Sequence, residues 1–152
     1  MSLPLSVKVE KLKDGSKRLI AVQTISPGDS IVPIFGETVS EPTMHTIATS
    51  ASTNVDGVGK SDAIWIYMNH SCTPNAYVDL SAMEFKCMNK VESGDELTFN
   101  YCTTEYTMSC PFTCICGTQS CSGQVQGFKH LNDIQRKEIR YVSEHVAEMA
   151  KA

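Results

Sequence analysis

The sequence has little basic charge, no long apolar run, and no cysteine before residue 72. Its 152 residues contain 13 Lys and Arg against 17 Asp and Glu, for a formal charge of −4. We therefore expect no direct nucleic-acid binding, which needs clustered basic residues, whereas a lysine-rich peptide is a compatible partner. Residues 1–14 alternate apolar and polar side chains without an apolar core. We expect neither a secretory signal nor a membrane span there.

The cysteine content points to a reducing environment. There are seven cysteines, and the first of them is Cys72. An odd number without an export signal favours free thiols or metal ligands over a disulfide framework. We therefore expect an intracellular location, with cytoplasm and nucleus equally compatible. The length and the 41% hydrophobic content are typical of one compact globular domain, and no repeat, low-complexity tract or linker divides it.

Short apolar or alternating segments separated by turn residues predict a mainly β protein. The turns are marked by the triplets Asp14-Gly15-Ser16, Pro27-Gly28-Asp29 and Ser93-Gly94-Asp95. The expected strands are 6–12, 18–25, 31–35, 76–80, 84–88 and 96–101. Segment 43–60 is rich in Thr, Ser and Gly, which predicts strand fragments within a loop.

The last twenty residues predict a helix from about 133 to about 150. Asn132 and Gln135 have the spacing of a capping pair. Apolar residues then recur at steps of three and four: Ile139, Val142, Val146 and Met149. This stripe fits packing against the rest of the domain better than it fits a partner-binding face.

Three motifs occur in a fixed order. Residues 69–75 read N-H-S-C-x-P-N, residues 94–101 read G-D-E-L-T-F-N-Y, and Cys114, Cys116 and Cys121 form C-x-C-x4-C. Together they resemble the SET domain of protein-lysine methyltransferases with its post-SET cysteines, over residues 7–128 and without a pre-SET module. The resemblance implies the SET β-fold with a knot-like C-terminal crossing. It divides the chain into a SET domain (1–108), a post-SET segment (109–128) and a C-terminal helix on the same domain (129–152).

The post-SET cysteines suit a structural zinc ion. Three thiols within eight residues match the tetrahedral preference of zinc, which normally takes four ligands. The resemblance implies that the fourth ligand comes from the N-H-S-C motif. The expected ligands are Cys72, Cys114, Cys116 and Cys121. The alternative is a set of unrelated buried thiols. The other cysteines are expected to be ordinary small apolar residues: Cys87, Cys102 and Cys110.

The resemblance also implies a catalytic site that methylates lysine. Tyr101 aligns with the catalytic tyrosine, while Phe99 and Tyr67 are expected to line the channel for the substrate lysine. The family carries either Phe or Tyr at the position of Phe99. Because phenylalanine leaves more room around the amine, we expect di- or trimethylation.

The expected cofactor is S-adenosylmethionine. By resemblance, Asn69 and His70 hold its adenine end, and the Asn69 side chain also holds the crossing together. Phe128 either covers the cofactor or packs the final helix. The glycine-rich turn that normally faces the cofactor reads Ser-Lys-Arg here. Two alternatives follow: Gly15 serves in a shifted alignment, or Lys17 or Arg18 meets the cofactor carboxylate.

The leading hypothesis is therefore an S-adenosylmethionine-dependent protein-lysine N-methyltransferase. Its substrate would be a lysine-bearing protein or peptide, of which a histone tail is one candidate. The replaced glycines also fit a second hypothesis, a catalytically silent SET module that binds a peptide or protein. A thiol redox or metal-handling protein is a third hypothesis, which a closed four-thiolate zinc site would exclude.

Overall fold

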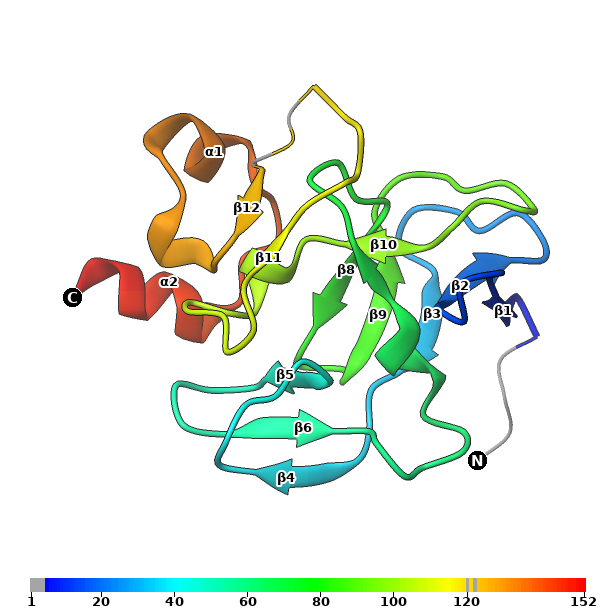
Figure 1. Ribbon diagram of the computed structural model, residues 1–152, viewed down its shortest axis with the longest axis horizontal. Coiled ribbons are helices and arrows are strands. Elements are labelled where there is room, and N and C mark those ends of the chain that lie inside the picture. Colours follow the sequence, from blue (N-terminus) through cyan, green and yellow to red (C-terminus); the bar gives the residue numbers. More distant parts are fainter. Residues whose placement is uncertain (1–4, 120, 122) are drawn as a thin grey trace.

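The computed structural model describes residues 5–119, 121 and 123–152, and within them it is mainly β, as the sequence predicts (Figure 1). The strands are β1 (Val7–Lys11), β2 (Lys17–Ala21), β3 (Ser30–Pro33), β4 (Glu37–Val39), β5 (Thr46–Ala48), β6 (Asn54–Asp56), β7 (Asn69–His70), β8 (Ala76–Asp79), β9 (Glu84–Cys87), β10 (Thr98–Phe99), β11 (Phe112–Thr113) and β12 (Gln124–Val125). The helices are the short 3-10 turns η1 (Ile64–Tyr67), η2 (Tyr101–Thr103) and η3 (Phe128–His130), and the α-helices α1 (Asp133–Glu138) and α2 (Glu144–Lys151). No helix in these described ranges is long and apolar enough to cross a membrane.

The first two strands form an antiparallel hairpin around the predicted Asp14-Gly15-Ser16 turn. The Asp14 carboxylate accepts a hydrogen bond from the Ser16 amide at 2.9 Å, and Gly15 takes a φ of +89°. That conformation is open to glycine at little cost. The register pairs Glu10 with Arg18, so these two side chains share one face of the hairpin.

Two three-stranded antiparallel sheets follow, ordered β3-β9-β8 and β4-β6-β5. Phe85 of β9 and Leu19 of the N-terminal hairpin are both completely buried and belong to the same apolar cluster. Gly36 precedes β4, and a Cβ at that position would overlap the Asp56 carbonyl oxygen of β6. Strand β5 lies at the edge of its sheet, which leaves its outer side open to other groups.

A short parallel pair, β7 with β10, brings the N-H-S-C-x-P-N segment against the strand before Tyr101. The register joins Asn69 to Thr98 and His70 to Phe99. Asn75 fixes the pairing: its side chain donates to the Glu96 carbonyl at 2.9 Å and accepts from the Thr98 amide at 3.0 Å. This contact between two distant segments is the arrangement that the predicted crossing requires.

The C-terminal segment differs from the single helix predicted over 133–150. That prediction was wrong in its continuity, since α1 ends at Glu138 and α2 begins at Glu144. Tyr141, between them, has a φ of +59°, and its ring stacks on Tyr77 with centroids 3.8 Å apart and planes 9° from parallel. The Ser143 amide donates to the Thr103 carbonyl at 2.8 Å. These tertiary contacts interrupt the helix. In a continuous helix the Ser143 amide would bond within the helix, and Tyr141 would not have a positive φ.

The predicted start of that segment is confirmed. Asn132 and Gln135 form a reciprocal capping box at α1, each side chain accepting from the other residue's amide at 2.8 Å. From the predicted apolar stripe, Val146 is completely buried, while Ile139 and Val142 are partly buried against the same cluster. The stripe therefore packs on the domain.

The buried residues fall into two clusters. The larger is made by the N-terminal hairpin, the two three-stranded sheets and η1, and the smaller consists of Cys102, Cys114, Val125, Phe128 and Val146. Cys87 and Cys102 are buried, as expected of small apolar residues, but Cys110 is exposed, so that expectation was wrong for Cys110. Tyr101 packs against both clusters.

Candidate functional site

Tyr101 is fixed in place by both its backbone and its side chain. It follows β10 and opens η2, so its amide lies beside β7 and donates to His70 Nδ1 at 3.0 Å. Its hydroxyl donates to the Met68 carbonyl at 3.0 Å, and its ring lies 4.8 Å from that of Phe99. Burial raises the pKa of Tyr101 to about 12. The hydroxyl therefore stays neutral at physiological pH, with its oxygen lone pairs available to accept a hydrogen bond.

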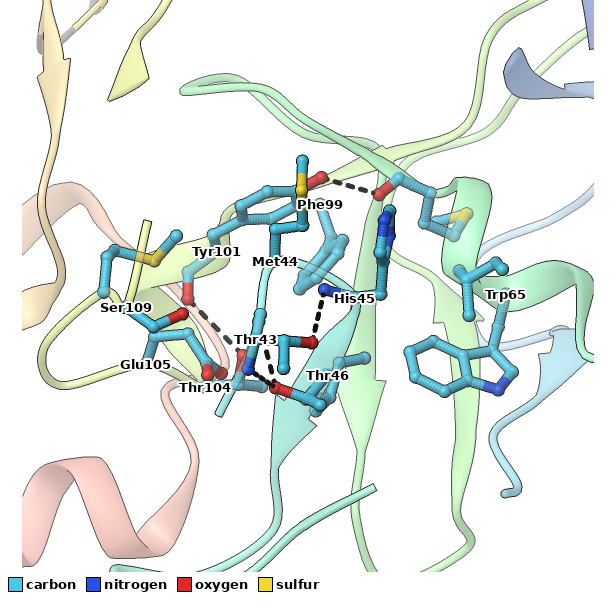
Figure 2. A pocket seen from close by; sticks show the side chains of 14 residues that line it. Thr43, Met44, His45, Thr46, Trp65, Phe99, Tyr101, Thr104, Glu105 and Ser109 are labelled. Carbon is cyan, nitrogen blue, oxygen red and sulfur yellow. Dashed lines mark hydrogen bonds between the residues drawn. The ribbon is translucent and has the colours of Figure 1, made fainter. Parts of the chain in front are cut away.

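A cavity of about 40 Å³ lies beside Tyr101 (Figure 2). Residues 43–47, leading into β5, form one side, and residues 104–109, following η2, form the other. Between them the walls are formed by the apolar side chains of Trp65, Met68 and Phe99, while the two flanking segments supply most of the polar groups of the lining. Apolar walls disfavour an ammonium ion relative to the neutral amine.

The predicted channel residues separate in the structure. Phe99 and Tyr101 both line this cavity, whereas Tyr67 is absent from its lining. The Tyr67 ring instead lies 5.1 Å from the Lys17 ammonium, in cation–π geometry.

Glu105 also lines the cavity, and the sequence reasoning did not single it out. Its carboxylate accepts from the Ala48 amide of β5 at 3.2 Å, and burial raises its pKa above the usual value. The signal in the sequence was weak: Glu105 follows Tyr101 by four residues, and its amide bonds the Tyr101 carbonyl at 3.0 Å. That single helical turn brings both side chains to one cavity.

Asn69 and His70 lie at the crossing, and their contact with the cofactor stays a prediction. The Asn69 amide group donates to the Lys17 carbonyl at 3.3 Å and to the Glu96 carboxylate at 3.1 Å, so it links the hairpin to the approach of β10. His70 Nε2 lies 3.4 Å from Cys72 Sγ. Burial lowers the pKa of His70 to about 4, so the imidazole is neutral.

Arg18 and Lys17 occupy the place of the missing glycine-rich turn. The Arg18 guanidinium is engaged by two carboxylates, with Nε 2.8 Å from Glu10 and Nη1 3.6 Å from Glu96. The Lys17 ammonium faces the Tyr67 ring. A contact between either side chain and a cofactor carboxylate stays a prediction.

Four cysteines form the predicted cluster. The sulfur atoms of Cys72, Cys114, Cys116 and Cys121 all lie within 4.8 Å of one another. Zinc–sulfur bonds of about 2.3 Å in a tetrahedron require sulfur–sulfur edges of about 3.8 Å. The sulfur atoms of Cys72 and Cys114 are 3.8 Å apart, so the donor set fits a structural zinc ion. One ligand comes from the crossing and three from the post-SET segment.

Phe128 is buried in the smaller cluster behind the cysteines. The Arg136 guanidinium lies 4.8 Å from its ring centroid. The preceding Gly127 has a φ of +112°, and a side chain there would overlap the Tyr106 carbonyl. These contacts correspond to the packing alternative for Phe128, and a cofactor contact stays a prediction.

Comparison with known proteins agrees with this fold and with the order of the motifs. Residues 16–102 match the SET domain family. Because the match covers more than half of the 152 residues, the chain belongs to the SET domain family.

Among known proteins, the chain is 44% identical over 64 residues to "Methyltransferase flvH" of Aspergillus flavus, and the match covers 41% of this chain and 36% of that protein. It is 30% identical over 142 residues to a "Histone-lysine N-methyltransferase, H3 lysine-36 specific" of Gibberella zeae, covering 80% of this chain and 15% of that protein. The chain thus corresponds to well under half the length of these relatives.

Solved structures show the same fold. The crystal structure of KRYPTONITE in complex with mCHG DNA and SAH superposes with a TM-score of 0.66 at 16% identity, covering 82% of this chain and 30% of that one. KRYPTONITE in complex with mCHH DNA, an H3(1-15) peptide and SAH gives a TM-score of 0.63, also at 16% identity and with the same coverage.

Proposed function

We propose that this chain is an S-adenosylmethionine-dependent protein-lysine N-methyltransferase domain acting inside the cell. The observation that carries the proposal is the position of Tyr101, whose hydroxyl borders an apolar cavity while its amide is bonded to the N-H-S-C-x-P-N segment. The proposal draws further support from the relatives named as methyltransferases and histone-lysine methyltransferases. The SAH in two structural neighbours supports the cofactor assignment.

The first task of the site is to present a neutral lysine amine. At pH 7 a lysine of ordinary pKa is almost fully protonated, and removing the proton costs about 4.6 kcal/mol. The apolar walls around Phe99 lower this cost because they favour the uncharged amine. The Tyr101 hydroxyl already donates to Met68, so its oxygen can accept an N–H of the amine and turn the nitrogen lone pair toward the methyl group.

S-adenosylmethionine, when bound, supplies an activated methyl group on a sulfonium. We propose that the backbone groups of Asn69 and His70 hold its adenine end, with Lys17, Arg18 and Phe128 as further contacts. The neutral imidazole of His70 suits this role, because it fixes the Tyr101 amide without adding charge beside a positively charged sulfonium.

The zinc ion, held by the four cysteines, would keep the post-SET segment against the crossing. Cys72 follows the Asn69-His70 pair by two residues, so the same ion links the proposed cofactor site to the C-terminal part of the chain. Closed four-thiolate sites are structural, and we assign no chemical step to the metal.

Phe99 is proposed to set the number of methyl groups transferred. It has no hydroxyl that could hold or crowd the amine, which favours dimethyl or trimethyl products. A Phe99→Tyr variant should shift the products toward monomethyllysine in an end-point mass spectrum. Monomethyl product alone from the unaltered protein at exhaustive turnover would refute this part of the proposal.

The test of the main proposal is methyl transfer to a lysine-bearing peptide array, read by mass spectrometry with zinc-loaded protein. Histone-tail peptides form one part of the array, because several relatives are named for histone H3. Tyr101→Phe keeps the ring but removes the hydroxyl. We expect it to lower the rate by about 100-fold, a typical loss for one positioning hydrogen bond at a reacting group, while calorimetry shows unchanged cofactor binding.

The second candidate function is a catalytically silent SET module that binds a peptide or protein. The observation that favours it is the segment 16–18, where Ser, Lys and Arg replace the usual glycines and Arg18 is held by Glu10 and Glu96. Calorimetric titration with S-adenosylmethionine distinguishes the two. Micromolar binding supports the enzyme, whereas a folded, zinc-loaded protein that binds no cofactor supports the silent module.

A further inference from the structure

The cavity beside Tyr101 carries one uncompensated carboxylate. Of the described residues that line it, Glu105 is the single Asp or Glu, none is a Lys or Arg, and His45 is the single histidine. The hydrogen-bond partners of Glu105 are the Ala48 amide and the side chain of Thr104. No ion pair to Glu105 occurs within the described part of the chain.

Glu105 is partly buried, and a partly buried carboxylate without an ion pair is unfavourable, because two neutral donors replace its hydration only in part. Burial accordingly raises the pKa of Glu105. A positively charged group brought next to it would offset that cost and favour the ionised carboxylate. No lysine or arginine of the described lining supplies such a group, so the carboxylate is open to a cation from outside the protein.

The position of Glu105 separates this cation from the lysine amine to be methylated. Figure 2 shows the Glu105 carboxylate across the cavity from the Tyr101 hydroxyl, which points toward Met68. Glu105 lies on one of the two segments that flank the cavity, near Ser109 and facing the other segment, residues 43–46. A peptide whose lysine reaches Tyr101 would pass between these segments and bring a neighbouring side chain to Glu105.

We propose that Glu105 recognises a second positive charge in the substrate, a lysine or arginine close in sequence to the lysine that is methylated. The substrates are then protein segments with paired basic residues. The inference rests on the proposed function for the target lysine, while recognition of the second charge is a matter of binding. The acidic net charge of −4 further favours encounter with such segments.

The experiment measures binding of fluorescent peptides to zinc-loaded protein by anisotropy, with S-adenosylhomocysteine present so that no methyl group is transferred. Each peptide has one central lysine, and Arg, Gln or Glu is placed at each neighbouring position in turn. We expect one position at which Arg binds about tenfold tighter than Gln, the usual range for a charge-assisted contact.

Three variants assign that preference. Glu105→Gln keeps an oxygen that can accept the Ala48 amide, so it should fold normally, and it should lower the Arg-to-Gln ratio to about one. Glu105→Arg should reverse the preference toward the Glu peptide. Glu37→Gln removes the same charge from an exposed strand residue outside the cavity and should leave the ratio unchanged.

An Arg preference that persists in Glu105→Gln overturns the inference, and so does the absence of any charge preference or of any peptide binding. Methylation is followed separately by mass spectrometry. Lysine methylation without a charge preference leaves the proposed function standing and removes this inference. A charge preference that depends on Glu105, without any methylation, supports this inference and counts against the proposed function.

Discussion

The two halves of this molecule are stabilised by different means. In the described residues, the larger cluster holds twenty buried side chains from residues 7–99, whereas the smaller cluster holds five from residues 102–146. We call the first region the core and residues 102–152 the tail (Figure 1). Five buried side chains bury too little apolar surface to hold fifty residues in one conformation. The tail therefore depends on attachments to the core.

Three kinds of attachment are visible. Cys72 lies in the core beside three tail cysteines, Tyr77 stacks on Tyr141, and the Ala48 amide donates to the Glu105 carboxylate. Tyr101 stands where the two regions meet and packs against both clusters. A site at that boundary is only as well ordered as the weaker of the two regions.

The largest expected effect is removal of the metal. Structural zinc sites of this kind contribute about 10–16 kcal/mol of apparent binding free energy, which exceeds what the smaller cluster can supply. A chelator should therefore abolish hydrogen-exchange protection in β11, β12 and α2, while the β3-β9-β8 sheet stays protected. Exchange measured by mass spectrometry tests this.

Two cysteine variants control for the thiols themselves. Cys116→Ser should reproduce the effect of the chelator, and Cys110→Ser should not, since Cys110 is exposed and lies outside the cluster. A tail that keeps its protection after complete zinc removal would contradict the comparison.

Truncating one buried side chain in each cluster should affect the core and the tail separately. Leu19 and Val146 are both completely buried, one in each cluster. Leu19→Ala should lower the free energy of global unfolding by about 2–5 kcal/mol, the usual range for a buried leucine. Val146→Ala should loosen the tail and change core unfolding little.

Fluorescence of the single tryptophan, the buried Trp65, reports the core during urea unfolding, and hydrogen exchange of α2 reports the tail. Equal losses of both signals in both variants would mean that the regions unfold as one unit.

Alkaline pH should weaken the boundary between the regions. Burial raises the pKa of Tyr101 to about 12, so between about pH 10 and that value the unfolded chain releases a proton that the native state keeps. This contribution to stability is complete below about pH 10 and is lost as the pH rises through the folded pKa. Tyr101→Phe should flatten the decline in unfolding free energy over this range, and Tyr141→Phe, with its exposed ring, should not.

The smallest expected effect is loss of the aromatic attachment. Tyr141→Ala removes the stack on Tyr77 and should cost about 0.5–1.5 kcal/mol. Because this contact holds only the tail, the loss should appear as faster exchange in α2. Tyr141→Phe retains the ring and should behave as the unaltered protein. A large increase of the exchange rate in α2 of that variant would assign the stabilisation to the hydroxyl.

Local signals in the sequence predicted the elements that depend on local interactions. The capping box of Asn132 and Gln135, the turn at Gly15 and most strand positions follow from neighbouring residues alone. The break between α1 and α2 does not, because it depends on Tyr77, more than sixty residues away along the chain. A stripe with helical spacing cannot indicate that a distant ring will draw Tyr141 out of the helix.

The same division holds for the site. The motifs identified the cysteine cluster and the neighbourhood of Tyr101. The pairing of Arg18 with Glu10 was not predicted, because it follows from the hairpin register, which single residues do not reveal. The contact of Arg18 with a cofactor stays a prediction. Glu105 was missed because its neighbours along the chain do not distinguish it from a surface glutamate. Its partly buried position depends on contact with β5, whose Ala48 amide donates to its carboxylate.

The division of ligands between core and tail also determines how the metal centre reassembles. Cys72 and Cys114 are separated by 42 positions of a continuous chain, so the two halves of the site can never diffuse apart. Once the ion is lost, the tail remains a tethered ligand whose local concentration is set by the intervening chain. Re-formation of the centre is then a unimolecular closure, whose rate varies with zinc but not with protein concentration, and whose cost grows only slowly with the length of the connecting loop.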